Sequence, residues 1–222
     1  MHIAFEARGN IDIVYRGTTG HGGLRRCILG PEQLPITLGT PLDGRSKTVV
    51  SDLINPHGFV LFRGYDVSSD REFHDFIECF GLPNFTYAES FSNAVRRNRT
   101  ARVFTANEAP PEVEIFLHHE MAQTLIFPGQ LFFFCEQAPT EGGATPICRS
   151  DLALATLETT RPGFVQKLRS TGVRYRNAMP ESADLASGQG RSWRDTLNVT
   201  DWKQAEQRLT ELGYNFQWLD DG

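Results

Sequence analysis

Short apolar runs separated by glycines, prolines and polar turns recur along this chain of 222 residues. Runs rich in β-branched and aromatic residues that are bounded by turn residues are typical of strands. On this basis we predict strands over residues 3–6, 11–15, 58–64, 115–121, 130–136 and 172–176. The first two surround Arg8-Gly9-Asn10, which predicts a hairpin.

Apolar residues spaced three or four apart predict helices between these strands. The expected helices span residues 45–55, 69–80, 151–158, 163–169 and 201–212. The clearest is residues 69–80, because Ser69 and Glu72 have the spacing of a capping box and Gly81 allows a left-handed exit. His74 lies off the apolar stripe of this helix, so we expect an exposed side chain. The stripe consists of Phe73, Phe76, Ile77 and Phe80.

Strands with intermittent helices favour a mainly β fold with flanking helices, either a sandwich or a barrel. We find no internal repeat and no convincing linker, so we expect a single domain over residues 1–222. Residues 84–112 and 178–200 are expected to include loops, and loops are the segments of a protein that most often determine which ligand it binds.

Composition narrows the class of protein. A formal net charge of −5 gives no reason to expect nucleic acid or an anionic membrane as partner. No apolar run approaches the roughly 18 residues of a membrane span, and the N-terminus lacks the pattern of a signal peptide. No Cys-x-x-Cys spacing occurs among the cysteines, so we expect free thiols in a cytoplasmic protein. The cysteines are Cys27, Cys79, Cys135 and Cys148.

His118 and Glu120 are the strongest candidates for chemistry. In an extended segment residues two apart point to the same side, so their side chains would converge. One imidazole and one carboxylate form two thirds of the facial triad that binds non-heme Fe(II). His119 would face the opposite side, where it packs or forms a hydrogen bond. The third ligand should be a distant histidine, yet no histidine follows residue 119.

Four arginines cluster in the loop that precedes this pair. They allow two interpretations, a solvated loop or a rim that attracts an anionic substrate. We favour the solvated loop because no aromatic residues are interleaved with the arginines. The arginines are Arg96, Arg97, Arg99 and Arg102.

Five segments, in their order along the chain, resemble the taurine dioxygenase (TauD/TfdA) family. The resemblance is closest to its clavaminate synthase-like branch, where Glu replaces the commoner Asp, and it runs from about residue 25 onward. It implies a double-stranded β-helix (jelly roll), Fe(II), and 2-oxoglutarate as cosubstrate. The segments are Gly58-Phe-Val-Leu-Phe-Arg-Gly64, Val103-Phe-Thr-Ala-Asn-Glu108, His118-x-Glu120, Phe132-Phe-Phe134 and Gly142-Gly-Ala-Thr145.

The resemblance also implies roles for single residues. His118 and Glu120 would be iron ligands, and Thr145 would donate its hydroxyl to a carboxylate of 2-oxoglutarate. The alternative for Thr145 is a strand or turn residue that contacts no ligand. Asn107 and Gln123 could face the substrate, although a structural role fits them equally well.

The chain departs from the family because the distal histidine, and the arginine that pairs with 2-oxoglutarate, are absent. We interpret the jelly roll as incomplete at its C-terminus, either in a truncated product or with the missing half on another chain. The family activity would use O2 to oxidise a C–H bond of a small metabolite. For this chain we expect weak divalent-metal binding, no turnover and self-association. The alternatives are a non-catalytic remnant or binding module of the same fold and a cupin-like binder without iron.

Overall fold

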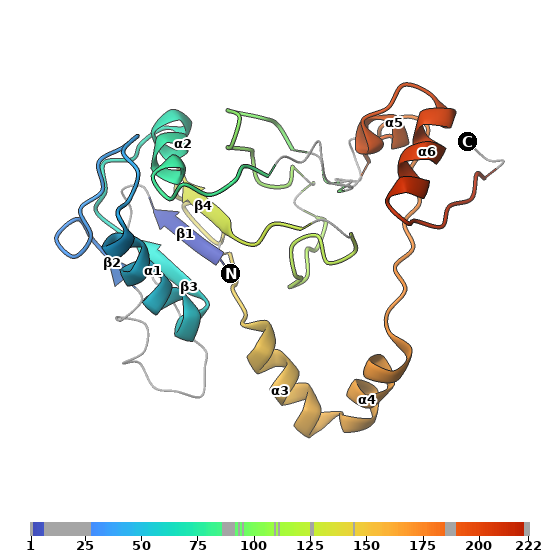
Figure 1. Cartoon of the computed structure of the whole chain (residues 1–222), viewed down its shortest axis with the longest axis horizontal. Coiled ribbons are helices and arrows are strands. Elements are labelled where there is room, and N and C mark those ends of the chain that lie inside the picture. The colour runs from blue at the N-terminus through green and yellow to red at the C-terminus, as the bar shows by residue number, and fades with distance from the viewer. Residues whose placement is uncertain are drawn as a thin grey trace. The chain divides into compact units, whose positions relative to one another are not determined.

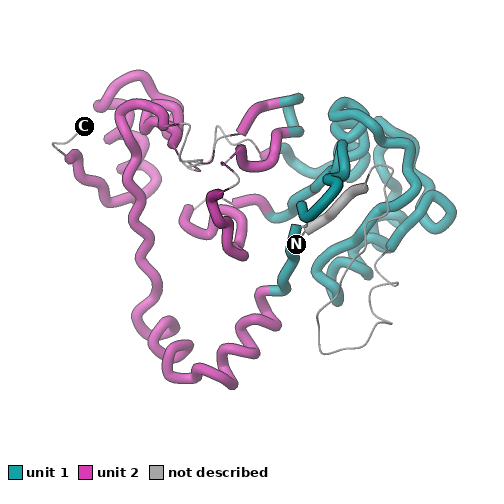
Figure 2. Tube along the Cα trace, turned by 180° about the vertical axis from the view of Figure 1, so that it is seen from behind, with its two compact units in different colours: residues 1–84, 99–103, 129–149 teal, residues 85–98, 104–128, 150–222 magenta. Residues whose placement is uncertain are grey.

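The structure is a computed structural model. It describes the backbone of residues 2–6 and, with side chains, residues 28–85, 92, 94, 96–108, 110, 112–124, 127–143, 145–184 and 190–219. The chain divides into two compact units (Figure 2). Unit 1 comprises residues 1–84, 99–103 and 129–149, and unit 2 comprises residues 85–98, 104–128 and 150–222.

Unit 1 is built on one sheet in which every strand pair is parallel (Figure 1). Its order is β2-β3-β1-β4. We expected β1 to form a hairpin with residues 11–15, but β1 pairs with β3 and β4 instead. Residues 11–15 lie outside the described part of the chain. The strands are β1 (His2–Glu6), β2 (Ile28–Leu29), β3 (Phe59–Phe62) and β4 (Leu131–Cys135).

The described residues are more helical than the expected mainly β fold, and their four-stranded sheet is not closed. Residues 115–121 and 172–176, predicted as strands, are irregular. A strand needs a neighbouring strand to satisfy the hydrogen-bonding groups of its backbone. The side chains of Ile115, Leu117 and Val173 are largely exposed, so the apolar residues of these segments are not packed as those of a strand would be. The jelly roll therefore stays a prediction.

Helix α1 (Gly44–His57) begins at Asp43, whose Oδ1 accepts from the Ser46 amide at 2.7 Å. Pro56 lies inside the last turn of this helix and does not end it. The stop comes from Gly58, which has a left-handed φ of 82° and donates its N–H to the Ile54 carbonyl at 2.6 Å.

Helix α2 (Asp70–Glu78) confirms the helix expected after Ser69. Ser69 Oγ accepts from the Glu72 amide at 3.2 Å, and the Glu72 carboxylate accepts from the Ser68 amide at 2.9 Å. The capping box thus reaches back one residue further than the usual pattern. The Ser68 amide and the hydroxyls of Ser68 and Ser69 all donate to the Glu72 carboxylate and lower the pKa of Glu72, the largest contribution coming from the Ser68 amide. Gly81 has a φ of 64°, as its left-handed exit requires.

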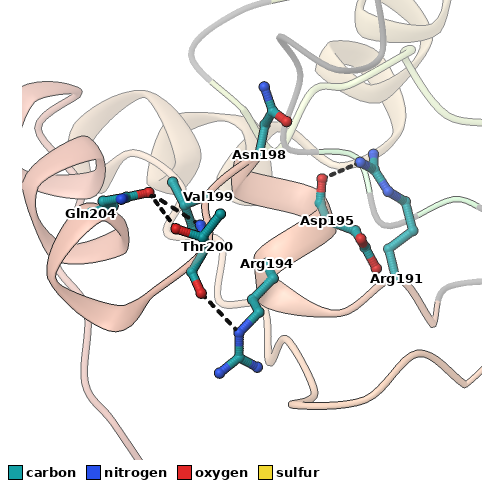
Figure 3. A pocket seen from close by; sticks show the side chains of 7 residues that line it. All are labelled: Arg191, Arg194, Asp195, Asn198, Val199, Thr200 and Gln204. Atoms are coloured by element: carbon teal, nitrogen blue, oxygen red, sulfur yellow. Dashed lines mark hydrogen bonds between the residues drawn. The ribbon is translucent and has the colours of Figure 1, made fainter.

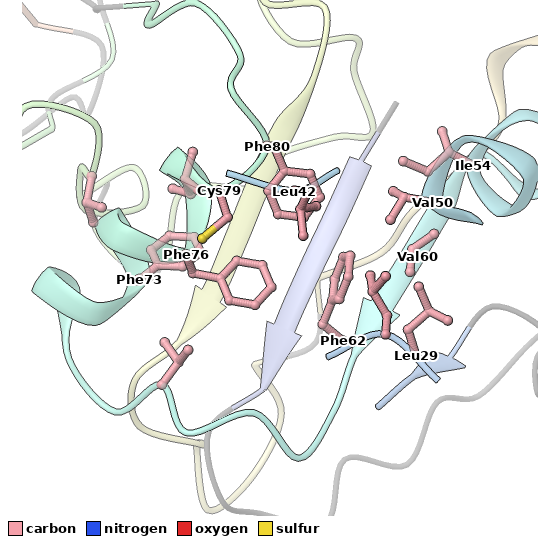
Figure 4. Close-up of a cluster of buried hydrophobic side chains, with 14 residues drawn as sticks. Leu29, Leu42, Val50, Ile54, Val60, Phe62, Phe73, Phe76, Cys79 and Phe80 are labelled. Atoms are coloured by element: carbon pink, nitrogen blue, oxygen red, sulfur yellow. The ribbon is translucent and has the colours of Figure 1, made fainter. Parts of the chain in front are cut away.

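The core of unit 1 lies between α1, α2 and one face of the sheet (Figure 4). Phe76 is fully buried, and its ring centroid lies 5.4 Å from that of Phe62. In β4, Phe132 and Phe134 pack against this core, whereas Phe133 between them is 39% exposed. This alternation is the period-two pattern of a strand with one face buried against helices.

His74 corrects a prediction, since its side chain is buried rather than exposed. Its Nδ1 lies 2.8 Å from Thr100 Oγ1, and its Nε2 lies 3.4 Å from Glu78 Oε1. The segment around Thr100 covers the face of α2 opposite the apolar stripe. Helical periodicity locates one buried face and cannot show that a later segment covers another.

Tyr65 is expected to make the stability of unit 1 depend on alkaline pH. Burial raises the pKa of Tyr65 to about 12. In the unfolded state the Tyr65 side chain ionises near the ordinary tyrosine pKa of about 10. The contribution of Tyr65 to the free energy of unfolding is therefore fully present below that pH and is lost as the pH rises toward the folded pKa. Because Tyr65 Oη donates to the Leu34 carbonyl at 2.6 Å, Tyr65→Phe should cost about 1 kcal/mol at neutral pH and reduce the alkaline loss. Urea unfolding at neutral and alkaline pH measures both effects; equal alkaline losses in the two proteins would contradict the assignment.

Unit 2 contains the other helices of the described chain. Ser150 is the first residue of α3, Pro162 occupies the first turn of α4, and α5 was not predicted. Asp201 caps α6 by accepting from the Gln204 amide at 3.0 Å. The helices are α3 (Ser150–Thr160), α4 (Pro162–Thr171), α5 (Trp193–Leu197) and α6 (Trp202–Glu211).

A small cluster holds α5 and α6 together. Trp193, Leu197 and Ala205 are its buried members. Trp202, the first residue of α6, is 53% exposed and is not one of the buried members of this cluster. Apolar side chains of α3 and α4, including Leu152 and Phe164, are also exposed. In the part of the chain that the structure describes, no helix combines the length and apolar character needed to cross a bilayer.

Candidate metal centre

The segment that carries His118 and Glu120 is not the strand that the sequence predicts. Residues 114–119 are irregular, and a turn begins at Glu120. Within this turn the Ala122 amide donates to the His119 carbonyl at 3.1 Å, and the Thr124 amide donates to the Met121 carbonyl at 3.0 Å. Met121 is buried and has a left-handed φ of 57°.

The side chains of His118 and Glu120 nevertheless approach each other. His118 Nε2 lies 3.8 Å from Glu120 Oε2. The side chain of His118 is 57% exposed, whereas that of Glu120 is 16% exposed. A solvent-facing imidazole thus meets a largely buried carboxylate.

Hydrogen bonding determines which nitrogen of His118 carries the proton. Its Nδ1 lies 2.7 Å from the Phe116 carbonyl oxygen, which can only accept. Nδ1 must therefore donate, and in the neutral imidazole Nε2 presents a lone pair. This arrangement is common for metal-binding histidines, whose other ring nitrogen donates to a carbonyl or carboxylate.

Glu120 has a second partner in Arg96. Arg96 Nη2 lies 3.5 Å from Glu120 Oε1, and the side chain of Arg96 is 19% exposed. No local sequence pattern predicts this pair, although a largely buried carboxylate generally requires a cation or several hydrogen-bond donors.

Each arginine of the basic cluster faces a carboxylate, so the cluster is neither a simple solvated loop nor a rim of uncompensated charge. Arg97 Nε lies 2.8 Å from Glu108 Oε2. The corresponding pairs in unit 1 are Arg99 with Asp70 at 2.9 Å and Arg102 with Glu78 at 3.3 Å.

The expected site residues belong to different compact units of the chain. Thr145 is exposed in an irregular segment of unit 1, after Gly142 and Gly143, both with a left-handed φ. His118 and Glu120 belong to unit 2. Among the described residues no group of three or more His, Cys, Asp or Glu side chains is arranged to hold a metal ion.

The donor set of His118 and Glu120 suits a divalent cation. Imidazole nitrogen and carboxylate oxygen are the donors of the two-histidine, one-carboxylate facial triad. Ligands at right angles around an ion, each about 2.1 Å away, stand roughly 3 Å apart. The observed 3.8 Å therefore requires only a small closure of the two side chains. The residues present fit two of the three protein ligands.

The remaining side chains singled out near this segment are Asn107 and Gln123. Asn107 Oδ1 is buried and has no hydrogen-bond partner among the described residues. Gln123 is exposed in the turn that follows Glu120. Neither observation assigns a contact with a substrate.

A second feature of unit 2 is an open depression of about 390 Å³ between α5 and α6 (Figure 3). It contains none of the expected site residues. Arg191 donates to the Ser92 carbonyl at 3.0 Å and to the Asp195 carbonyl, and Arg194 donates to the Thr200 carbonyl at 3.3 Å. Both arginines donate to backbone carbonyls, so we interpret their role in the depression as structural, stabilising the backbone around α5 and α6.

Comparison with known proteins identifies the family. The family model described as "Taurine catabolism dioxygenase TauD, TfdA family" matches residues 18–209. The chain belongs to this family. TauD/TfdA membership confirms the resemblance found in the motifs and supports assignment to the non-heme iron and 2-oxoglutarate oxygenases.

Two curated relatives extend this assignment. A clavaminate synthase-like protein from Arabidopsis thaliana is 40% identical over 189 residues, which cover 85% of this chain and 57% of the relative. The dapdiamide synthesis protein DdaC from Enterobacter agglomerans is 26% identical over 173 residues, covering 78% of this chain and 49% of the relative. The TauD/TfdA-family chain thus spans about half the length of the curated relatives it matches.

Proposed function

We propose that this chain carries part of an Fe(II)- and 2-oxoglutarate-dependent dioxygenase that oxidises a C–H bond of a small metabolite. His118 and Glu120 are the proposed metal ligands. One observation carries the proposal: His118 Nε2 and Glu120 Oε2 lie 3.8 Å apart, close enough for one ion to contact both atoms. A divalent cation between the two atoms would be attracted by the carboxylate and bound by the imidazole nitrogen.

Each residue has a separate task in this proposal. The Phe116 carbonyl holds Nδ1–H of His118 and keeps Nε2 available to the ion. Glu120 supplies negative charge that offsets the dication. Thr145 donates its hydroxyl to a carboxylate of 2-oxoglutarate. The ion and 2-oxoglutarate, when bound, supply the oxidation of substrate by O2.

A non-catalytic binding module of the same fold is the second candidate. It is favoured by the pairing of Glu120 with Arg96, which offsets the charge of the carboxylate without a metal ion. Under either candidate we expect weak metal binding by this chain, because two protein ligands hold an ion less firmly than three. The domain that we propose extends over residues 1–222.

His118→Ala is the test of the proposed metal site. Removing a ligand should cost at least as much as removing an outer partner of one, so we expect Co(II) affinity to fall about tenfold or more. Isothermal titration with Co(II) under anaerobic conditions measures the change. The matched control is His119→Ala, because His119 is the exposed neighbour and should leave Co(II) affinity unchanged.

Equal Co(II) affinities in the wild-type chain and His118→Ala would refute the site. Adding Fe(II) and 2-oxoglutarate anaerobically separates the two candidates. The visible charge-transfer band of bound 2-oxoglutarate favours the oxygenase, and metal binding without this band favours the binding module.

A further inference from the structure

The carboxylate of Glu120 divides its two oxygens between different partners. Oε2 lies 3.8 Å from His118 Nε2, and Oε1 lies 3.5 Å from Arg96 Nη2. We propose that Arg96 is a positioning residue: it occupies Oε1 and thereby limits Glu120 to binding a divalent cation through Oε2 alone. This inference rests on the proposed function, because it needs an ion between His118 and Glu120.

The backbone that carries Arg96 is held in place. Arg96 Nη1 donates to the Thr105 carbonyl at 3.4 Å. The Thr105 amide donates to the Arg97 carbonyl at 3.0 Å, and the Arg97 amide donates to Thr105 Oγ1 at 3.0 Å. An antiparallel bridge between Asn98 and Phe104 continues this pairing. The guanidinium therefore reaches Glu120 from a fixed base rather than from a loose loop.

Glu120 is equally constrained on its side of the pair. The turn after it is closed by backbone hydrogen bonds, and the following side chain, that of Met121, is 3% exposed. The Glu120 side chain itself is 16% exposed and that of Arg96 is 19% exposed. Limited exposure reduces solvent screening, so the charge of Arg96 acts on Glu120 more strongly than a surface arginine would.

One-oxygen binding matters for the proposed chemistry. A carboxylate that binds through both oxygens occupies two coordination positions of an ion. The facial arrangement needs three open positions for 2-oxoglutarate and O2. A guanidinium on Oε1 opposes two-oxygen binding both by occupying that oxygen and by repelling the dication. Because the two cations share one carboxylate, each must weaken the binding of the other.

Arg96→Met tests this role with Mn(II) as the probe. Loss of the guanidinium removes the repulsion and its contact with Oε1, so we expect Mn(II) affinity to rise about fivefold or more, the lower end of typical coupling between sites. We also expect the number of water molecules on bound Mn(II) to fall by about one, because Oε1 takes a coordination position. Water-proton relaxation measures both quantities without turnover.

Two further variants separate charge from a general structural effect. Arg96→Lys keeps the positive charge and should keep Mn(II) affinity and hydration close to those of the wild-type chain. Arg97→Met is the matched control, because Arg97 is 77% exposed and pairs with Glu108 instead of Glu120. Arg96→Gln, which is neutral and too short to reach Oε1, replaces Arg96→Met if circular dichroism shows that the methionine variant does not fold.

The outcomes distinguish failure of this inference from failure of the proposed site. Unchanged Mn(II) affinity and hydration in the neutral Arg96 variants overturn the role of Arg96 alone. A gain in affinity that persists after His118→Ala is added also overturns it, because the ion then binds elsewhere. Absence of Mn(II) binding in the wild-type chain, or full binding by His118→Ala alone, overturns the proposed site and this inference together.

Discussion

Phe76→Ala is expected to lower the free energy of unfolding of unit 1 by about 3–5 kcal/mol. Phe76 is fully buried, and its ring centroid lies 5.4 Å from that of Phe62, 5.5 Å from that of Tyr65 and 5.6 Å from that of Phe80. Alanine would remove these contacts and leave a cavity that rings on fixed elements cannot fill. Urea unfolding followed by tyrosine fluorescence and circular dichroism measures the loss.

The matched control is Phe133→Ala in β4, which removes the same side chain where it is 39% exposed. We expect a loss no greater than about 1–2 kcal/mol for this control, because less apolar surface is returned to water. Equal losses in the two variants would show that Phe76 is not a central residue of the core.

Glu120→Ala is expected to have the largest combined effect on stability and on metal binding. Removing one partner of a fully buried ion pair costs about 3–5 kcal/mol, and the partial exposure of both side chains reduces our expectation to about 2 kcal/mol. The alanine variant also removes one of the two proposed ligands, so Co(II) affinity should fall about tenfold or more. Urea unfolding and Co(II) titration measure the two effects separately.

Comparison with His118→Ala makes this prediction specific. The His118 side chain is 57% exposed, so its removal should weaken Co(II) binding and change stability by no more than about 0.5 kcal/mol. Glu108→Ala is the control for loss of an acidic side chain, since its partner Arg97 is 77% exposed. Stability of Glu120→Ala equal to that of Glu108→Ala would refute the importance of the Arg96–Glu120 pair.

The parts of the fold that the sequence predicts well are those set by neighbouring residues. In α2 the cap at Ser69, the acceptor at Glu72 and the stripe through Phe76 all lie within three turns. Each signal acts through contacts inside the helix, so the pattern alone determines where the helix begins and which face is buried.

The candidate site shows the opposite case. Ile115 and Leu117 favour a strand by type, yet their side chains are 52% and 62% exposed and the segment is irregular. Strand formation depends on a distant partner, which local composition cannot supply. The closeness of His118 and Glu120 comes from an irregular segment leading into a turn rather than from the alternation of a strand.

Long-range ion pairs account for other differences. Arg99 and Arg102 pair with Asp70 and Glu78 of α2, and Thr100 between them contacts His74. Partners more than twenty residues apart leave no mark in the local pattern. Helix α5 could have been predicted from local sequence, because Ser192 and Asp195 have the spacing of a capping box. We did not predict it because the surrounding residues are polar and rich in glycine, which favours a loop.

The position that follows Glu120 is occupied by Met121, and its backbone and its side chain favour different residue types. Its φ of 57° lies in the region that glycine and asparagine enter most easily. Its side chain, 3% exposed, fills space that neither of those residues would occupy. β-Branched residues fit the volume but are disfavoured by this backbone conformation. We therefore expect this position to accept only unbranched, mostly apolar side chains, so the backbone beside Glu120 tolerates few replacements.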